Sequence, residues 1–296
     1  TTTLAGMSDP AEHTFGFRTR ALHAGGVPDP TTGARAVPIY QSTSFVFNDT
    51  ADAANLFALQ KYGNIYSRIG NPTVAALEER IASLEGGIGA VATASGMSAE
   101  FITFAALAGT GDHIVAASSL YGGTVTQLDV TLRRFGVETT FVGGTDPADY
   151  EAAITESTKA VYAEVIANPS GEITDIAAVS EMAHAVGAKV IVDNVFATPI
   201  FQQPLKLGAD VVVYSATKHI DGQGRVLGGA ILTSEAINEE FYRDSLRHTG
   251  PSLSPFNAWV MLKGLETLDL RVRRQSDTAA ALADVMAEHK KVQTVL

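Results

Sequence analysis

The stretch "VVVYSATKHIDGQGRVLGG", residues 211–229, decides how the rest of the chain is interpreted. Three valines run into Tyr214, a continuous apolar pattern that is typical of a buried strand. Ser215 and Thr217 then place two hydroxyls next to Lys218, and a glycine-rich loop follows. The sequence therefore predicts one amine just past the end of a buried strand, with hydrogen-bonding side chains beside it.

Lys218 is the candidate nucleophile. A lysine amine becomes reactive when partial burial or neighbouring positive charge lowers its pKa, and a position after an apolar strand allows partial burial. A single lysine is more often an exposed loop residue, so its neighbours decide the interpretation. The hydroxyls of Ser215 and Thr217 can donate hydrogen bonds to phosphate oxygens. An amine beside phosphate ligands points to a phosphorylated aldehyde held as a Schiff base.

Asp193 ends the apolar run "KVIVDN", 25 residues before Lys218. A buried carboxylate costs free energy unless it is paired. A protonated pyridine nitrogen would pair it and would keep such a ring poor in electrons. The alternative is an ordinary turn or helix-capping aspartate.

Other segments add groups that suit a phosphorylated aromatic ring. In "ATASGMSAE", the amides of Gly96 and Met97 would point from a helix N-terminus at an anion, although such turns are common. Tyr66 and Arg68 offer a phenol and a guanidinium that suit a phosphate. Tyr121 follows another strand, where its ring could stack on an aromatic cofactor or simply pack in the core.

Short apolar runs alternate with helical patterns from residue 71 onward. This alternation predicts an α/β fold with a mostly parallel sheet, whose strand ends meet at one ligand-binding edge. The first 50 or so residues look irregular, and the proline- and glycine-rich segment 25–43 predicts an extended arm or a frayed terminus. After Leu232 the pattern is largely helical.

Composition excludes several classes of protein. The 296 residues carry a formal net charge of −11, which argues against a nucleic-acid-binding surface. Without cysteine there is no disulfide framework and no thiolate zinc site, and we expect no metal. The N-terminus lacks the apolar core of a signal peptide, and no apolar run approaches the ~18 residues of a membrane span. We therefore expect a cytoplasmic protein without a membrane partner.

Taken together, six segments make the chain similar to a known family. "NIYSRIGNPT", "ATASGM", "LYGGT", "ANPSGEITDI", "VDNVFATP" and "SATKHIDGQG" occur in the order and spacing of the Cys/Met-metabolism pyridoxal-phosphate enzymes. The resemblance implies fold type I, the aspartate-aminotransferase-like fold, with a mostly parallel seven-stranded sheet and flanking helices. It also implies an arm over residues 1–60, a cofactor-binding large domain over 61–250 and a helical connection over 251–296. The small C-terminal domain of the family would be largely missing, and with it the arginine that binds the substrate carboxylate.

The resemblance implies pyridoxal 5'-phosphate as the cofactor and assigns roles to individual residues. Lys218 would carry the cofactor and shuttle protons, Asp193 would pair with the ring nitrogen, and Tyr121 would stack on the ring and take part in catalysis. Asn168 would bind near the ring hydroxyl. The phosphate would be held by Gly96, Met97, Ser215 and Thr217, and by Tyr66 and Arg68 of an adjacent subunit. A homodimer would then be the minimum active unit, with a tetramer as the expected assembly.

Within the family, the two halves of the chain differ in their resemblance. The N-terminal half looks like O-acetylhomoserine sulfhydrylases, whereas the segment from His219 to Leu268 looks like O-succinylhomoserine sulfhydrylases. Both imply that sulfide replaces the acyloxy group of an O-acylhomoserine to give homocysteine, in methionine biosynthesis. Gly123 stands where methionine γ-lyases carry a cysteine, which counts against that activity. Alternatives are cystathionine γ-synthase, a γ-lyase of the family, or a non-catalytic module that binds phosphate or the cofactor.

Overall fold

Seven strands form one sheet in the computed structural model, which describes residues 15–58, 60–61, 63–143, 146–234 and 245–295. The strand order is β1-β7-β6-β5-β4-β2-β3. The five strands from β6 to β3 pair in parallel, and β7 is antiparallel to both of its neighbours. The expected α/β fold with a mostly parallel seven-stranded sheet is confirmed. The strands are β1 (Gly89–Thr93), β2 (His113–Ala117), β3 (Glu138–Val142), β4 (Thr158–Glu164), β5 (Lys189–Asp193), β6 (Val211–Tyr214) and β7 (Gly229–Thr233).

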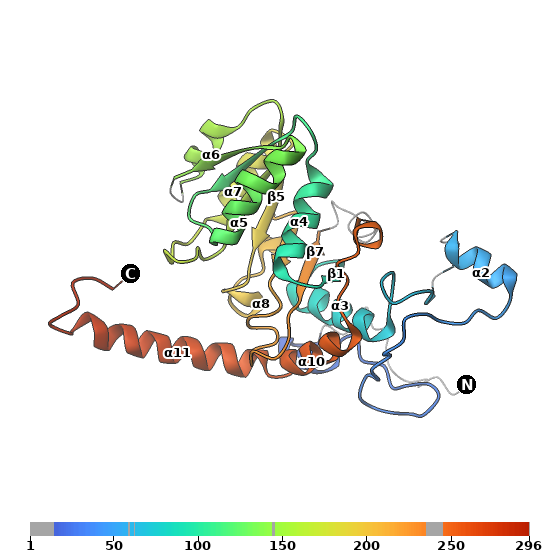
Figure 1. The fold of residues 1–296 in the computed structure, drawn as a ribbon. Helices are drawn as coiled ribbons and strands as arrows, with labels where there is room; N and C mark the ends of the chain where they lie inside the picture. Colours follow the sequence, from blue (N-terminus) through green and yellow to red (C-terminus); the bar gives the residue numbers. More distant parts are fainter. Residues whose placement is uncertain (1–14, 59, 62, 144–145, 235–244, 296) are drawn as a thin grey trace.

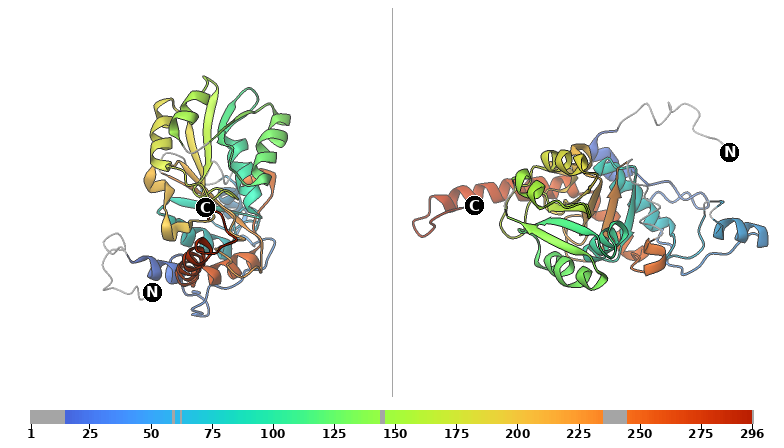
Figure 2. Two further views of the ribbon diagram at one scale, coloured as in Figure 1. Left: turned by 90° about the vertical axis from the view of Figure 1, so that its left-hand side faces the viewer. Right: turned by 90° about the horizontal axis from the view of Figure 1, so that it is seen from above.

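Helices cover both faces of this sheet, which explains why its central strands are apolar without alternation. Every residue of β1, β2, β6 and β7 is buried. α4 and α5 lie on one side and α7 on the other, as the left view of Figure 2 shows. The main helices around the sheet are α3 (Pro72–Glu85), α4 (Gly96–Leu107), α5 (Gly122–Thr126), α6 (Pro147–Ala153) and α7 (Ile176–Ala185). Short helical turns follow at Gln127–Thr131, Leu132–Phe135, α8 (Thr198–Phe201) and Pro204–Leu207.

The N-terminal segment is more ordered than its composition indicates. It contains α1 (Phe17–His23) and α2 (Thr50–Phe57), neither of which the irregular pattern predicted. α1 packs on α3, and Ala21 is buried in the core between them. Residues 1–14 of the expected arm lie outside the described residues. Figure 1 shows that α2 extends away from the sheet.

Two helices account for the helical pattern after Leu232, part of which (235–244) lies outside the described residues. α10 (Pro255–Leu265) packs against α3, and α11 (Leu268–Ala287) runs past the end of the sheet on the side opposite α2 (Figure 1). In the part of the chain that the structure describes, no helix is long and apolar enough to cross a membrane. The division at residues 60 and 250 remains a prediction.

Candidate active site

A cavity of about 520 Å³ opens at the carboxyl edge of the sheet. Because β7 is antiparallel to both neighbours, β1 runs in the same direction as β6, and the ends of β1, β2, β4, β5 and β6 all meet at this edge. The cavity is lined by eight of the ten residues predicted from the sequence. They are Gly96, Met97, Tyr121, Asn168, Asp193, Ser215, Thr217 and Lys218.

Tyr66 and Arg68 are not among the residues that line this cavity. The Arg68 guanidinium lies over the Tyr66 ring, 5.4 Å from its centroid, and donates a hydrogen bond to the carbonyl of Arg247. The Tyr66 residue is 39% exposed. These two side chains therefore form a surface pair separate from the cavity of their own chain.

The start of α4 meets the end of β6 at a glycine. A Cβ at position 96 would lie 2.6 Å from Ser215 Cβ, so only glycine lets the two segments approach so closely. Ser95 caps the helix, because its hydroxyl accepts the Ser98 N–H at 3.1 Å. The Thr217 hydroxyl accepts the N–H of Gly228 at 3.1 Å and fixes the turn beyond β6. The Thr217 hydroxyl also donates to the Gly228 carbonyl at 3.2 Å. Among the described residues the amides of Gly96 and Met97 have no partner, and with the hydroxyls of Ser215 and Thr217 nearby they suit an anion such as phosphate.

Asp193 lines the cavity from the end of β5. Its Oδ1 accepts the N–H of Val195 at 2.7 Å, and the residue is 9% exposed. Within the described part of the chain, Oδ2 has no hydrogen-bond partner. Burial, and secondarily the nearby Glu100 carboxylate, hold the pKa of Asp193 well above its usual value. A cationic ligand group would find Oδ2 without a competing partner, and its positive charge would favour the ionised form of Asp193.

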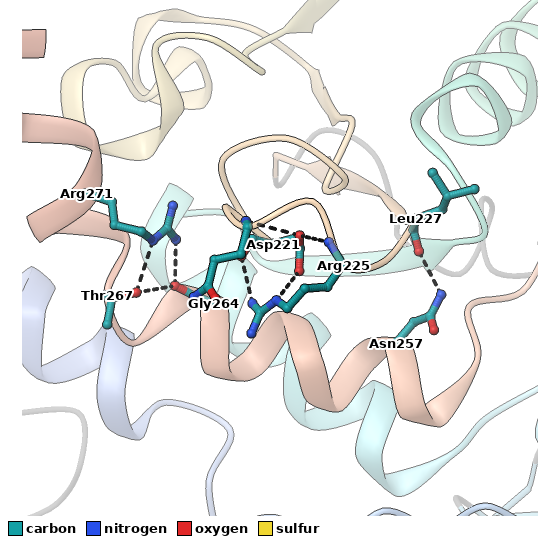
Figure 3. Close-up of polar contacts among 8 residues, drawn as sticks. Asp221, Arg225, Leu227, Asn257, Gly264, Thr267 and Arg271 are labelled. Atoms are coloured by element: carbon teal, nitrogen blue, oxygen red, sulfur yellow. Dashed lines mark hydrogen bonds and ion pairs between the residues drawn. The ribbon is translucent and has the colours of Figure 1, made fainter. Parts of the chain in front are cut away.

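Lys218 is exposed at the cavity, whereas its position after an apolar strand had indicated partial burial. The loop that follows is held firmly (Figure 3). The buried Asp221 carboxylate accepts the Arg225 N–H at 2.8 Å and the Arg225 Nε at 3.0 Å. Asn257 of α10 donates to the Leu227 carbonyl at 3.0 Å. The glycine-rich loop thus keeps a fixed wall beside the lysine.

Tyr121 lines the cavity and is 51% exposed. Its ring lies against Gly123, where a Cβ would come within 2.5 Å of Tyr121 Cε1. The structure places Tyr121 beside the cavity rather than in the core.

Two buried acids at this edge were not identified from the sequence. The Glu164 carboxylate accepts the backbone N–H groups of Tyr121 and Asn168. Glu100 accepts the hydroxyls of Thr124, at 2.9 Å, and Tyr162, at 3.2 Å. Burial raises the pKa of Glu164, and it raises the pKa of Glu100 to about 7. The available signal was an acid in each of two apolar segments, "YAEVI" and "SAEFI".

A larger cavity of about 640 Å³ lies elsewhere, between α1, the segment after it and α10, and shares no lining residue with this edge. Its basic side chains include Arg80 and Lys263, and both lie close to Glu266, at 3.8 and 2.8 Å. It contains Lys263 and the ring of Trp259, but its acid, Glu266, is part-exposed and already pairs with both cations, and no buried acid among the described residues lines it. The cavity at the carboxyl edge is therefore the candidate active site.

The residues present fit pyridoxal phosphate. Oδ2 of the buried Asp193 is available for a protonated ring nitrogen, and the start of α4 with Ser215 and Thr217 is suited to the phosphate. Lys218 supplies an amine for the aldehyde, and Tyr121 supplies a ring that can stack. In the described part of the chain no cluster of histidine, cysteine or acidic residues could hold a metal ion.

Comparisons with known proteins agree with this fit. Residues 18–296 match the family model of the Cys/Met metabolism PLP-dependent enzymes. The O-acetyl-L-homoserine sulfhydrylase of Leptospira meyeri is 42% identical, over 95% of this chain and 72% of its own length. The O-succinylhomoserine sulfhydrylase of Mycobacterium tuberculosis is 47% identical, over 91% of this chain and 69% of its own length.

A solved structure from Campylobacter jejuni has the same fold, with a TM-score of 0.90 and 35% identity over 94% of this chain and 77% of its own. That protein is described as a putative O-acetylhomoserine (thiol)-lyase, and it contains N'-pyridoxyl-lysine-5'-monophosphate. Family model, relatives and fold agree, and the chain belongs to the Cys/Met metabolism PLP-dependent enzymes.

Proposed function

We propose that this protein is a pyridoxal-phosphate-dependent O-acylhomoserine sulfhydrylase. In the reaction the bond between Cγ and the acyloxy oxygen breaks and a bond between Cγ and sulfur forms. Acetate or succinate leaves, sulfide enters, and the product is homocysteine. Relatives named for the acetyl and the succinyl ester, at 42% and 47% identity, support this reaction and leave both esters as substrates to be compared.

The cofactor, when bound, supplies an electron-poor ring that stabilises negative charge at the substrate Cα. Asp193 would keep that property by holding the ring nitrogen protonated, because Oδ2 is free to accept a hydrogen bond. Lys218 would hold the aldehyde of the cofactor, and its amine would move protons between Cα and the neighbouring carbons of the substrate. Tyr121 would stack on the ring and stand beside the acyloxy group as it leaves.

The remaining lining residues would fix the position of the cofactor. The amides of Gly96 and Met97, together with the hydroxyls of Ser215 and Thr217, would hold the phosphate. Asn168 would donate to the ring hydroxyl from the loop after β4. Residues that hold both ends of the cofactor would restrict its position in the cavity, and such positioning contributes to the rate.

One observation carries this proposal: a nucleophilic amine, a buried carboxylate and an aromatic ring, which follow or end three different strands, meet in one cavity. A phosphate-binding module without catalysis would account for Gly96, Ser215 and Thr217 but not for this convergence. The test is the release of homocysteine from sulfide and O-acetyl-L-homoserine or O-succinyl-L-homoserine by the holo-protein. Lys218→Ala is the control, and equal release by both proteins would contradict the proposal.

We also propose a homodimer as the minimum active unit, a tetramer as the assembly and the cytoplasm as the location. The surface pair of Tyr66 and Arg68 supports the dimer, because two side chains whose chemistry suits a phosphate lie outside the cavity of their own chain. They would complete the phosphate site of a neighbouring subunit.

A further inference from the structure

Glu164 joins the two loops that border the active-site cavity. Its Oε1 accepts the N–H of Tyr121 at 2.6 Å, and its Oε2 accepts the N–H of Asn168 at 2.9 Å. The Glu164 residue, at the end of β4, is 3% exposed. One buried carboxylate therefore satisfies a backbone donor from the loop after β2 and another from the loop after its own strand.

This contact adds to the first turn of α5, where the Tyr121 carbonyl accepts the N–H groups of Thr124 and Val125 at 2.9 and 3.1 Å, and it fixes the amide of the tyrosine. Its side chain is half exposed, so core packing does not set the position of the ring. Three residues further on, the Thr124 hydroxyl is bound to the buried carboxylate of Glu100. The segment that carries the ring is thus anchored to two acids, and Glu164 takes the amide of the tyrosine itself.

An ionised carboxylate suits this position because it only accepts hydrogen bonds, and each of its two oxygens faces one N–H. A glutamine has nearly the same shape, but its NH₂ group would face one of the two backbone donors. That donor would lose its partner in a buried place, which is costly. One of the two loops would therefore move.

We propose that Glu164 is a positioning residue that sets the Tyr121 ring against the cofactor by tying the Tyr121 and Asn168 loops together. The inference rests on the proposed function, since it assumes that pyridoxal phosphate binds in this cavity. Glu164 would act through Tyr121 and would not itself touch the substrate.

The experiment compares Glu164→Gln with Glu156→Gln. Glu156 is an exposed acid in the turn before β4, and its replacement removes the same charge. The readouts are the circular dichroism of the bound cofactor and its dissociation constant. We expect Glu164→Gln to reduce the cofactor band and to weaken cofactor binding about tenfold, the effect of losing one charge-assisted hydrogen bond. Glu156→Gln should match the wild type.

A double-mutant cycle separates positioning from general support of the fold. If Glu164 acts through Tyr121, then Glu164→Gln should weaken cofactor binding little further in a Tyr121→Ala background. If Glu164→Gln does not fold, Glu164→Asp replaces it, because the shorter side chain keeps the charge but cannot reach both N–H groups. The same loss of the cofactor band is expected.

Equal cofactor bands and dissociation constants in Glu164→Gln and Glu156→Gln would overturn the inference and leave the proposed function intact. So would effects of Glu164→Gln and Tyr121→Ala that simply add. A wild-type protein that binds no pyridoxal phosphate would remove the proposed function and this inference together.

Discussion

Gly123 makes room for the ring of Tyr121, because a Cβ at position 123 would lie 2.5 Å from Tyr121 Cε1 and 3.2 Å from the sulfur of Met97. Contacts below about 3 Å force one of the groups to move. Gly123 is therefore a requirement for the position of the tyrosine seen here.

Replacing Gly123 by alanine should displace the Tyr121 ring and weaken cofactor binding by about tenfold, the scale of a lost aromatic contact. Titration of the apoprotein with pyridoxal phosphate, followed by absorbance, measures this. Gly122→Ala is the matched control, since nothing lies within 4 Å of a Cβ at position 122. Equal dissociation constants for the two variants would contradict the account of Tyr121.

The loop after Lys218 offers a second pair of glycines. Gly222 and Gly224 both have positive φ, at 70° and 66°, so alanine is strained at either position. Only at Gly222 would a Cβ also meet Arg271, 1.9 Å from Nη1. Figure 3 shows this arginine held by the Thr267 hydroxyl and the Gly264 carbonyl.

Gly222→Ala should therefore reduce the free energy of unfolding more than Gly224→Ala does, and the difference should be about 1–3 kcal/mol. Urea unfolding of the two variants measures the difference directly. Equal losses would mean that the arginine moves aside without cost and that the loop is less firmly held than described.

The buried acid Glu85 should make stability depend on pH. It accepts the Tyr214 hydroxyl at 2.5 Å, yet burial raises its pKa from 4.5 to about 8. Between these values the unfolded chain binds fewer protons than the folded one, so the free energy of unfolding falls as pH rises. Glu85→Gln cannot ionise and therefore lacks this loss of stability. At pH 8 its free energy of unfolding should exceed that of the wild type by roughly a few kcal/mol.

Thermal unfolding of Glu85→Gln and wild type, measured from pH 4.5 to pH 8, checks this. Glu100 also has a raised pKa, but it titrates in both proteins and cancels in the comparison. Parallel curves for the two proteins would contradict the raised pKa of Glu85.

The proposed dimer can be tested by mixing two inactive proteins. Arg68→Ala and Lys218→Ala subunits should regain part of the activity when they exchange, because one hybrid site would contain both lesions and another would contain neither. The measurement is homocysteine release after subunit exchange, which two different tags can demonstrate. No recovery despite exchange would indicate that each site is built from one chain.

Much of the site was predictable because parallel strands bring their carboxyl ends to one edge. Asp193 and Lys218 each stand at the end of an apolar run. The direction of the strands alone brings such residues to one edge of the sheet, whatever their side chains are. The same rule placed Gly96 and Tyr121 at the cavity, whereas Asn168 was assigned from the family resemblance. The family assignment and the cofactor are confirmed by the comparisons, whereas the individual roles of these residues stay predictions.

Glu164 and Glu100 were missed because their function depends on distant backbone and hydroxyl donors. Glu164 contacts Tyr121, 43 residues away, and periodicity carries no information about such a contact. α1 was missed for a related reason: its seven residues show too little apolar periodicity to be predicted, and packing against α3 stabilises it.

The most direct test of the central claim is reduction of the holo-protein with borohydride, followed by peptide mapping. The account predicts that pyridoxyl is fixed on Lys218, the one amine that lines the cavity within the described residues. Lys218→Ala should then lose the label. A label on another lysine, with Lys218 unmodified, would contradict the assignment of this cavity as the active site.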